Sequence, residues 1–316
     1  MAVGEYRVRQ TVADRRSVYP ELGARLRVLV PVLKGQMARP IVSIGDALLA
    51  FPGASGSLLA LIEADPTIPG SVVTHVERRR DMLRWIAGLD YERALNRRMN
   101  VTMRVAADVV GYLRDVVAET ESNTVVLELP TAMSPRRHRL GAIAAQLAVS
   151  PPADMLFVRS DSGSPELEIA PRSILVPIRG GPSARIVAAT AAAIADAFGS
   201  ALTLLHVESD SQHPDRSRRE RRTFGRIVEE MHRPSTVVNL VRDEAPARCI
   251  LERSAAHDLV IMGSWLNPEQ PRILVGRGLM RAVHRIRCPV IVIRPQRSGL
   301  AGPMRGATQV EARGWL

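Results

Sequence analysis

Aromatic residues are scarce in this sequence, where Phe, Trp and Tyr together make up 3% of the 316 residues. The core must therefore be filled by Ala, Val, Ile and Leu, and the hydrophobic content of 46% supports packed domains rather than disorder. Small and β-branched apolar residues favour a buried parallel sheet covered by Ala-rich helices over an aromatic-packed β-sandwich.

Cysteine is also scarce, since Cys249 and Cys288 are the only two in the chain. Two cysteines cannot build a disulfide framework or a zinc site, and no segment resembles a secretion signal. The longest apolar stretch, residues 186–207, is divided by Asp196 and Gly199 into a helix and a strand, which argues against a membrane span. We expect a soluble, cytoplasmic protein.

Lysine is nearly missing, because Lys34 is the only one, so the net charge of +11 is carried by arginine. A basic chain can bind nucleic acid or an anionic membrane. These arginines are spread over the whole sequence, however, which favours an arginine-rich soluble surface. The densest run, residues 213–233, is expected to be a solvated helix or loop. On a helix, the residues facing solvent would be Arg218, Arg219, Arg221, Arg222 and Arg226. Acidic residues interrupt this run and no aromatic platform accompanies it, so we expect no specific nucleic-acid binding.

Two segments of similar pattern indicate that the chain is a duplication. They are "RVLVPVLKGQMARPIVSIGDALLAF" from Arg27 and "SILVPIRGGPSARIVAATAAAIADAF" from Ser173. Each holds a β-branched run that ends in Val-Pro, then a glycine-bearing turn and an Ala/Ile-rich helix. Further strands and helices alternate in the same order in both halves, and such alternation requires parallel pairing through right-handed crossovers.

The fold class predicted is α/β, with two tandem, doubly wound, five-stranded parallel sheets of the Rossmann-like type. We expect a flexible tail over 1–25, domain 1 over 26–159, a polar linker over 160–172, domain 2 over 173–295 and a second tail over 296–316. The fifth strand of each half, near residues 155–158 and 290–293, would leave an apolar edge. The two fifth strands are expected to cover each other, which would pack the halves as an internal pseudo-dimer.

The second half resembles the universal stress protein family in "ILVPI", "ALTLLHV", "DLVIMGS" and "RCPVIVIRP". The first half matches through "RVLVPV" and the order of its elements. The turn "VPIRGGPSAR" is also similar to stress-protein-type domains on the cytosolic side of amino-acid permeases and cation antiporters. The resemblance implies a stress-response protein, and in many members ATP is held by an acid after the first Val-Pro. A stretch Gly-x2-Gly-x9-Gly-Ser/Thr after the fourth strand holds its phosphates.

This sequence departs from that pattern at several positions. Gly263 and Gly276 fit the first and last glycines, but Leu266 stands where the middle glycine should be and Arg277 replaces the hydroxyl residue. Arg179 occupies the place of the acid, and a cation there cannot accept hydrogen bonds from a ribose or an adenine amine. The resemblance assigns the following candidate cofactor-binding residues: Arg179, Val207, Gly263, Ser264, Gly276, Arg277 and Gly278. In the first half, Leu33 and Pro130 replace the corresponding residues, so no nucleotide site is expected there.

Several functions follow as alternatives. The preferred one is a cytoplasmic binding and regulatory protein without catalysis, with an altered or lost nucleotide pocket in domain 2. One alternative keeps ATP in domain 2, and a related one makes the arginines a site for phosphate or another small anion. A third is an interaction scaffold that attends a membrane transporter and binds no small ligand. We find no nucleophile, acid/base pair or metal site in the sequence. We expect a protein partner, and the sequence leaves open whether two copies of the chain form a homodimer.

Overall fold

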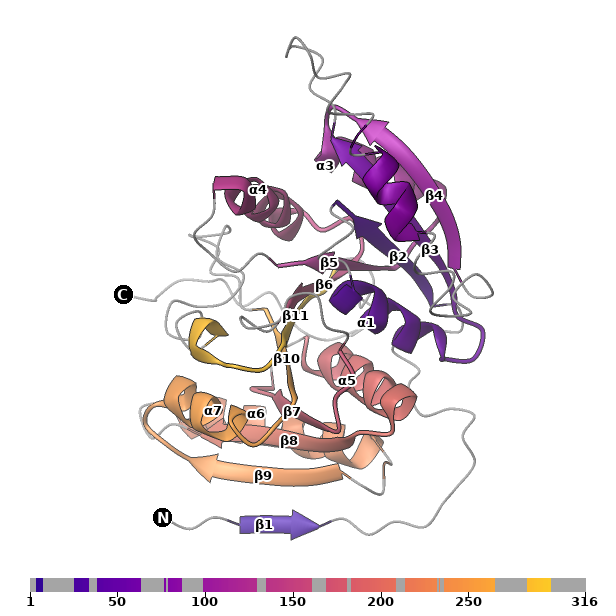
Figure 1. Cartoon of the computed structure of the whole chain (residues 1–316). Coiled ribbons are helices and arrows are strands. Elements are labelled where there is room, and N and C mark those ends of the chain that lie inside the picture. The colour runs from indigo at the N-terminus through magenta and orange to yellow at the C-terminus, as the bar shows by residue number, and fades with distance from the viewer. Residues whose placement is uncertain are drawn as a thin grey trace.

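The structure is a computed structural model, and its described residues form one sheet of eleven strands in the order β1-β9-β8-β7-β10-β11-β6-β5-β2-β3-β4 (Figure 1). The described residues are 4–7, 26–33, 39–63, 77, 79–86, 99–129, 135–160, 169–180, 183–208, 214–231, 233, 236–264 and 283–296.

Each half of the chain contributes five parallel strands, with the first strand at the centre and the chain reversing direction beside it. This arrangement confirms the doubly wound α/β class predicted from the alternating elements. The first half comprises β2 (Arg27–Val32), α1 (Arg39–Leu49), β3 (Ser55–Glu63), β4 (Met99–Ala106), α3 (Val109–Glu119), β5 (Thr124–Glu128), α4 (Pro135–Val149) and β6 (Asp154–Arg159).

The second half repeats the order of the strands, and the basic run, for which the sequence left a helix or a loop open, forms the helix α6 (Pro214–Glu230). Its elements are β7 (Ser173–Pro177), α5 (Ala184–Phe198), β8 (Ala201–Glu208), α6 (Pro214–Glu230), β9 (Thr236–Arg242), α7 (Pro246–Ser254), β10 (Leu259–Gly263) and β11 (Val290–Arg294). On α6 the five arginines named above are exposed, while Phe224 and Ile227 are buried, as is Met231 directly after the helix. The helical period of 3.6 explains this division.

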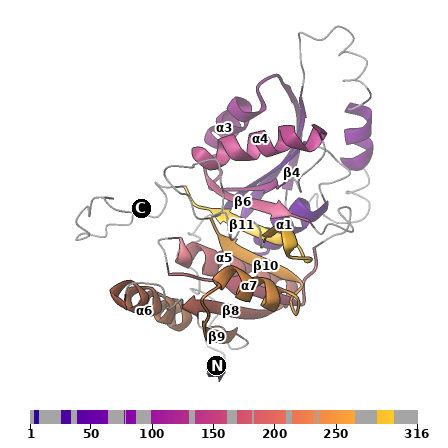
Figure 2. The ribbon, with the colours of Figure 1, turned by 90° about the vertical axis from the view of Figure 1, so that its left-hand side faces the viewer.

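Two apolar cores lie on opposite faces of the sheet. One joins residues of α1, α5 and α6, such as Ile44, Ala191 and Phe224. The other joins residues of α3, α4 and α7, such as Leu147 and Ile250, and Figure 2 shows α3 and α4 side by side over the upper strands. Because the first core contains residues of both halves, the halves share one continuous layer of packing.

The two halves are joined by their fifth strands, as predicted from their apolar edges. β6 pairs antiparallel with β11, from Arg159 opposite Val290 to Met155 opposite Arg294. The predicted pair of five-stranded sheets is therefore one continuous sheet, because each edge satisfies the backbone groups of the other.

Arginines at the ends of these two strands hold the seam from both sides. Arg159, which is 1% exposed, donates from its Nη2 to the carbonyls of Ile286 at 2.8 Å and Cys288 at 2.7 Å. From the opposite end, Arg294 donates from Nε to the carbonyl of Ala148 at 3.2 Å. The two contacts mirror each other, since each arginine ends one seam strand and reaches the segment that precedes the other.

Two segments outside the predicted domains contribute to the fold. Residues 1–25 were expected to be a flexible tail, but Gly4–Arg7 form β1, which pairs antiparallel with the edge strand β9. An edge strand offers unpaired backbone groups to such a segment. At the end of the linker, Ile169 is 4% exposed and its carbonyl accepts a hydrogen bond from Ser43 Oγ of α1 at 2.8 Å. The linker is thus anchored to the first half.

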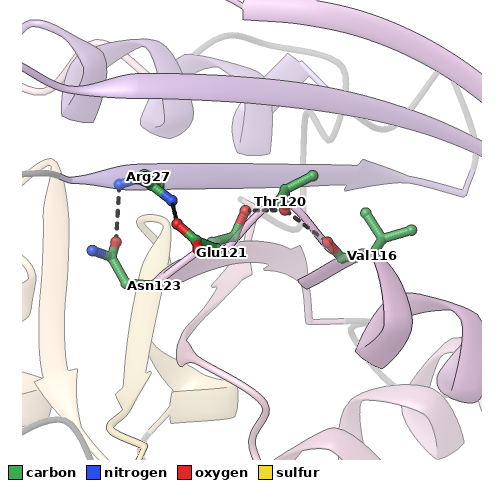
Figure 3. A network of polar contacts seen from close by, with 6 residues as sticks. Arg27, Val116, Thr120, Glu121 and Asn123 are labelled. Atoms are coloured by element: carbon green, nitrogen blue, oxygen red, sulfur yellow. Dashed lines mark hydrogen bonds and ion pairs between the residues drawn. The ribbon is translucent and has the colours of Figure 1, made fainter. Parts of the chain in front are cut away.

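The turn between α3 and β5 is tied to the start of β2 by polar contacts (Figure 3). Arg27 forms an ion pair with Glu121, and its backbone N donates to Asn123 Oδ1 at 2.9 Å. Thr120 Oγ1 donates to the carbonyl of Val116 at 2.7 Å, which also accepts from the backbone N of Thr120 at 2.9 Å at the end of α3. Glu121 has a positive φ of 48°, and this left-handed residue turns the chain into β5.

Candidate functional site

The carboxyl ends of β7 and β10 form the place in the second half where the chain changes direction across the sheet. β7 pairs on one side with β8 and on the other with β10, where Ile174 lies opposite Leu259 and Leu175 opposite Val260. Arg179 follows β7 and Gly263 ends β10, so both lie at the same edge of neighbouring strands. Doubly wound sheets bind ligands at such a switch point.

Arg179 is directed toward α6. Its Nε lies 3.4 Å from Glu220 Oε1, with the arginine side chain 39% exposed and the glutamate side chain 13% exposed. The adjacent turn also packs on this helix, because a Cβ placed on Gly180 would lie 2.7 Å from the backbone oxygen of Glu220. The cation that stands in the place of the expected acid is therefore compensated by a carboxylate from α6.

His206, near the end of β8, is bonded to the segment that follows the neighbouring strand β7. The ring is 1% exposed, and its Nδ1 donates to the carbonyl of Ile178 at 2.8 Å. The ring also stacks on Phe224 of α6, with the ring centroids 5.0 Å apart. The neighbouring candidate Val207 faces the other way and packs against the core of α3, α4 and α7. The end of β8 is thus filled by protein groups on both faces.

Gly263 is closely approached by the first turn of α5. A Cβ at this position would lie 3.2 Å from both Ser183 Oγ and Val187 Cγ2. Its neighbour Ser264 donates from its backbone N to the carbonyl of Ile293 at 2.8 Å. The hydroxyl of Ser264 is buried and makes no hydrogen bond within the described part of the chain. The small size of Gly263 is accordingly used for helix–strand packing.

The other candidates fall outside this geometry. Gly276, Arg277 and Gly278, together with Leu266, lie outside the described residues. In the first half, Leu33 follows β2 and packs against the second core, while Pro130 also lies outside the described residues. The structure therefore brings Arg179, Gly263 and Ser264 to one switch point and places Val207 one strand away.

A buried carboxylate that the sequence did not single out lies beside this site. Glu208 ends β8 and is 7% exposed, with Oε1 3.3 Å from Arg221 Nε and Oε2 3.5 Å from Arg242 Nε. Arg242 comes from the neighbouring strand, where it lies opposite Glu208. A charged residue at the end of an apolar strand was the available signal, but the three partners meet only through strand register and the docking of α6.

The described residues contain neither a candidate metal site nor a candidate membrane span. Among them, no group of three or more His, Cys, Asp or Glu side chains could hold a metal ion. No helix within the same residues is both long enough and apolar enough to cross a bilayer. Neither Cys249, which is buried, nor Cys288, which is partly buried, forms a disulfide.

Comparisons with known proteins agree with this fold. Residues 171–294 match the model of the Universal stress protein family, and no curated protein matches the chain. A universal stress protein from Archaeoglobus fulgidus DSM 4304 is similar in structure, with 15% identity and a TM-score of 0.57 over 89% of this chain and 99% of that one. The cytoplasmic domain of a prokaryotic cation chloride cotransporter is similar too, with 12% identity and a TM-score of 0.55 over 86% and 96% of the two chains.

Proposed function

We propose, from the premise that residues 171–294 form a universal stress protein domain, that this chain is a cytoplasmic regulatory protein without catalytic turnover. Its second half would carry the responsive site, at the switch point between β7 and β10. In this proposal the site no longer grips ATP in the way that the family motif describes. The first half would serve as its packing partner across the β6–β11 seam.

The observation that carries the proposal is the close packing at Gly263. A glycine in a phosphate cradle leaves room for an anion to approach the backbone. Here Ser183 Oγ and Val187 Cγ2 already lie 3.2 Å from the position that a Cβ would take. Arg179 adds to this argument, since it replaces the acid that would hold adenosine and forms an ion pair with Glu220.

The Arg179–Glu220 pair suggests how the site would respond to a ligand. A small anion such as phosphate would compete with Glu220 for the guanidinium, because arginine binds both groups through charge-assisted hydrogen bonds. Release of Glu220 would weaken the contact between the β7–α5 turn and α6. A ligand that binds only the released form shifts the population toward it.

Calorimetric titration of the full chain tests this function. We expect no saturable heat with magnesium ATP up to about 1 mM, which corresponds to binding weaker than about 4 kcal/mol. Low-micromolar ATP binding would overturn the proposal. A Gly263→Val variant is unsuitable as a control, because the contacts at Gly263 mean that a larger side chain would disturb folding.

The response to phosphate is tested with Glu220→Gln, which keeps the shape of the side chain but removes its charge. We expect this variant to bind inorganic phosphate about threefold to tenfold more tightly than the parent chain. The matched control is Glu229→Gln, an exposed position on the same helix, which should leave phosphate affinity unchanged. Equal behaviour of the two variants would contradict the competition between phosphate and Glu220.

A second candidate is an interaction module that attends a membrane transporter. The observation in its favour is the likeness to the cytoplasmic domain of a cation chloride cotransporter, which extends over both halves of this chain. In that case nucleotides and phosphate would leave the melting temperature unchanged. Chemical cross-linking of the chain in intact cells should then join it to a membrane transporter, and cross-links confined to soluble proteins would exclude this candidate.

A further inference from the structure

The two outer edges of the sheet differ in how they are covered. At one end β1 lies antiparallel on β9, and at the other end β4 pairs with β3 alone among the described residues (Figure 1). β9 and β4 are equivalent strands, since each is the third strand of its half. Among the described residues, the same position in the duplicated fold is thus covered in one half and open in the other.

The open strand β4 has the character of a pairing surface. Val101 is 37% exposed and Val105 is 54% exposed, and exposed β-branched residues on an edge strand favour association with another strand. Arg104 is the only charged residue in "MNVTMRVA", and the strand contains no proline. β4 therefore has few of the features that usually protect a free edge strand, which are several charges, a proline or a bulge.

The backbone of β4 also has an acceptor available at this edge. The carbonyl of Met103 accepts a hydrogen bond from Nη1 of its own neighbour Arg104 at 2.9 Å. A side chain can reach this oxygen only because it faces outward from the β3 pairing. Arg104 is exposed, so its hydrogen bond to the carbonyl of Met103 contributes little to stability. A backbone N–H of another strand can take its place.

We propose that β4 pairs antiparallel with β4 of a second copy of this chain, around a twofold axis that passes between the two Met103 residues. In that register each Val101 lies opposite Val105 of the other copy. The twofold axis gives two such pairs, which together cover all four exposed valines of the dimer. Thr102 lies opposite Arg104, which keeps the two arginines apart and gives each guanidinium a hydroxyl to contact. If the twofold axis passed between the two Thr102 residues instead, the Val101–Val105 pairs would be lost. If it passed between the two Arg104 residues, the two guanidinium groups would lie opposite each other.

The chain itself supplies the precedent for this mode of contact. Its own halves are joined by antiparallel pairing of two edge strands, β6 and β11. A twofold axis through β4 would repeat this type of joint between copies and continue the sheet through both. Helical residues 79–86 lie on the same face of the sheet, because Ile86 of that helix and Met103 of β4 pack against the same core.

Sedimentation equilibrium of the full chain measures the association. Two short strands make a small interface, so we expect a dimer with a dissociation constant of about 10–100 μM. A chain that stays monomeric up to about 300 μM would overturn the proposal. Deletion of residues 1–8 should leave the dimer intact. If the deletion variant is monomeric, the strand that pairs with β4 is β1 of the second copy and not its β4.

Charge changes at Thr102 test the register. Thr102→Glu places two carboxylates opposite the two Arg104 residues and should tighten the dimer about threefold to tenfold, while Thr102→Arg should weaken it by a similar factor. Thr102 is exposed, so neither variant disturbs the core. Ala118→Glu, at an exposed position on α3, controls for net charge and should have no effect. The same direction of change for both Thr102 variants would contradict this register.

Cross-linking gives a second measurement of the axis. Two Met103→Cys chains would bring their thiols together, because opposite residues of antiparallel strands have Cα atoms about 4.5–5.5 Å apart, within the range of a disulfide. A Val101→Cys chain should not link to itself, because Val105 of the other copy lies opposite. Equal cross-linking of the two variants, or none in Met103→Cys, would refute the axis.

Discussion

Gly180 is the position where a single methyl group should be most informative. Its φ is 95°, a conformation that residues with a Cβ rarely adopt, and the left-handed region costs them about 1–2 kcal/mol. The added Cβ would also lie 2.7 Å from the backbone oxygen of Glu220 and 2.9 Å from its Cα. Backbone atoms cannot rotate away as a side chain can, so this overlap adds about 1–3 kcal/mol. We therefore expect Gly180→Ala to lower the free energy of unfolding by about 2–5 kcal/mol.

Two other glycines separate the contributions. Gly199 also has a positive φ, 67°, but nothing lies within 4 Å of its added Cβ, so Gly199→Ala should show the backbone cost of about 1–2 kcal/mol alone. Gly225 lies inside α6 with nothing within 4 Å and without a positive φ, so Gly225→Ala should stabilise the chain by about 0.5–1 kcal/mol.

Urea unfolding followed by circular dichroism ranks the three variants, with the midpoint changing and the slope constant. The expected order of stability is Gly225→Ala, the parent chain, Gly199→Ala and then Gly180→Ala. A Gly180→Ala variant no less stable than Gly199→Ala would refute the close docking of the β7–α5 turn on α6. The Arg179–Glu220 contact would then lose its structural support as well.

Three further predictions concern the seam and the response to pH. Arg159→Met removes the donor to the carbonyls of Ile286 and Cys288 and should lower the free energy of unfolding in urea by about 2–4 kcal/mol. Arg294→Met removes the contact with the carbonyl of Ala148 at a partly buried position and should lower it by about 1 kcal/mol or less. Equal losses in the two variants would contradict the larger contribution of buried Arg159. Burial raises the pKa of the Asp258 carboxyl, but hydrogen bonds from the Arg172 backbone, the Ser173 hydroxyl and the Ser173 backbone outweigh it and hold the pKa below its ordinary value of 3.8. Asp258 therefore stabilises the fold above that pH and loses its contribution as the pH falls through the lowered pKa, so Asp258→Asn should flatten the acid limb of a stability–pH curve. Burial raises the pKa of the Asp154 carboxyl, with a hydrogen bond from the Gln296 backbone opposing it, so its ionisation costs stability as the pH rises and Asp154→Asn should be neutral or stabilising at pH 7; the same pH response in both variants would contradict these assignments.

Local patterns were sufficient to predict much of this fold. The fifth strands expected near residues 155–158 and 290–293 are Asp154–Arg159 and Val290–Arg294, and the helix α3 begins at Val109 directly after an aspartate. Asp108 is the N-cap, and its carboxylate accepts hydrogen bonds from Val110 and Gly111. Such signals are local, because helix caps and the periods of 2 and 3.6 residues act within a few positions of the chain.

The candidate site was predicted only in part. The family motif led to Arg179 and Gly263, and the structure places both beside the switch point. It did not lead to Glu220 or Glu208, which reach the site from α6 and from the end of β8. Their partners lie 41 and 13 residues away in the sequence, so no local period connects them.

The sequence by itself determined the duplication, the order of strands and helices and the apolar faces, because each depends on residue type at short spacing. Tertiary structure alone decided that β1 would cover β9, while no other described strand than β3 pairs with β4. It also decided that Arg179 would meet a carboxylate from α6. It also decided that the space above Gly263 would be filled by α5. These outcomes depend on strand register and on how helices dock on the sheet, and both are set by contacts between residues far apart in the chain.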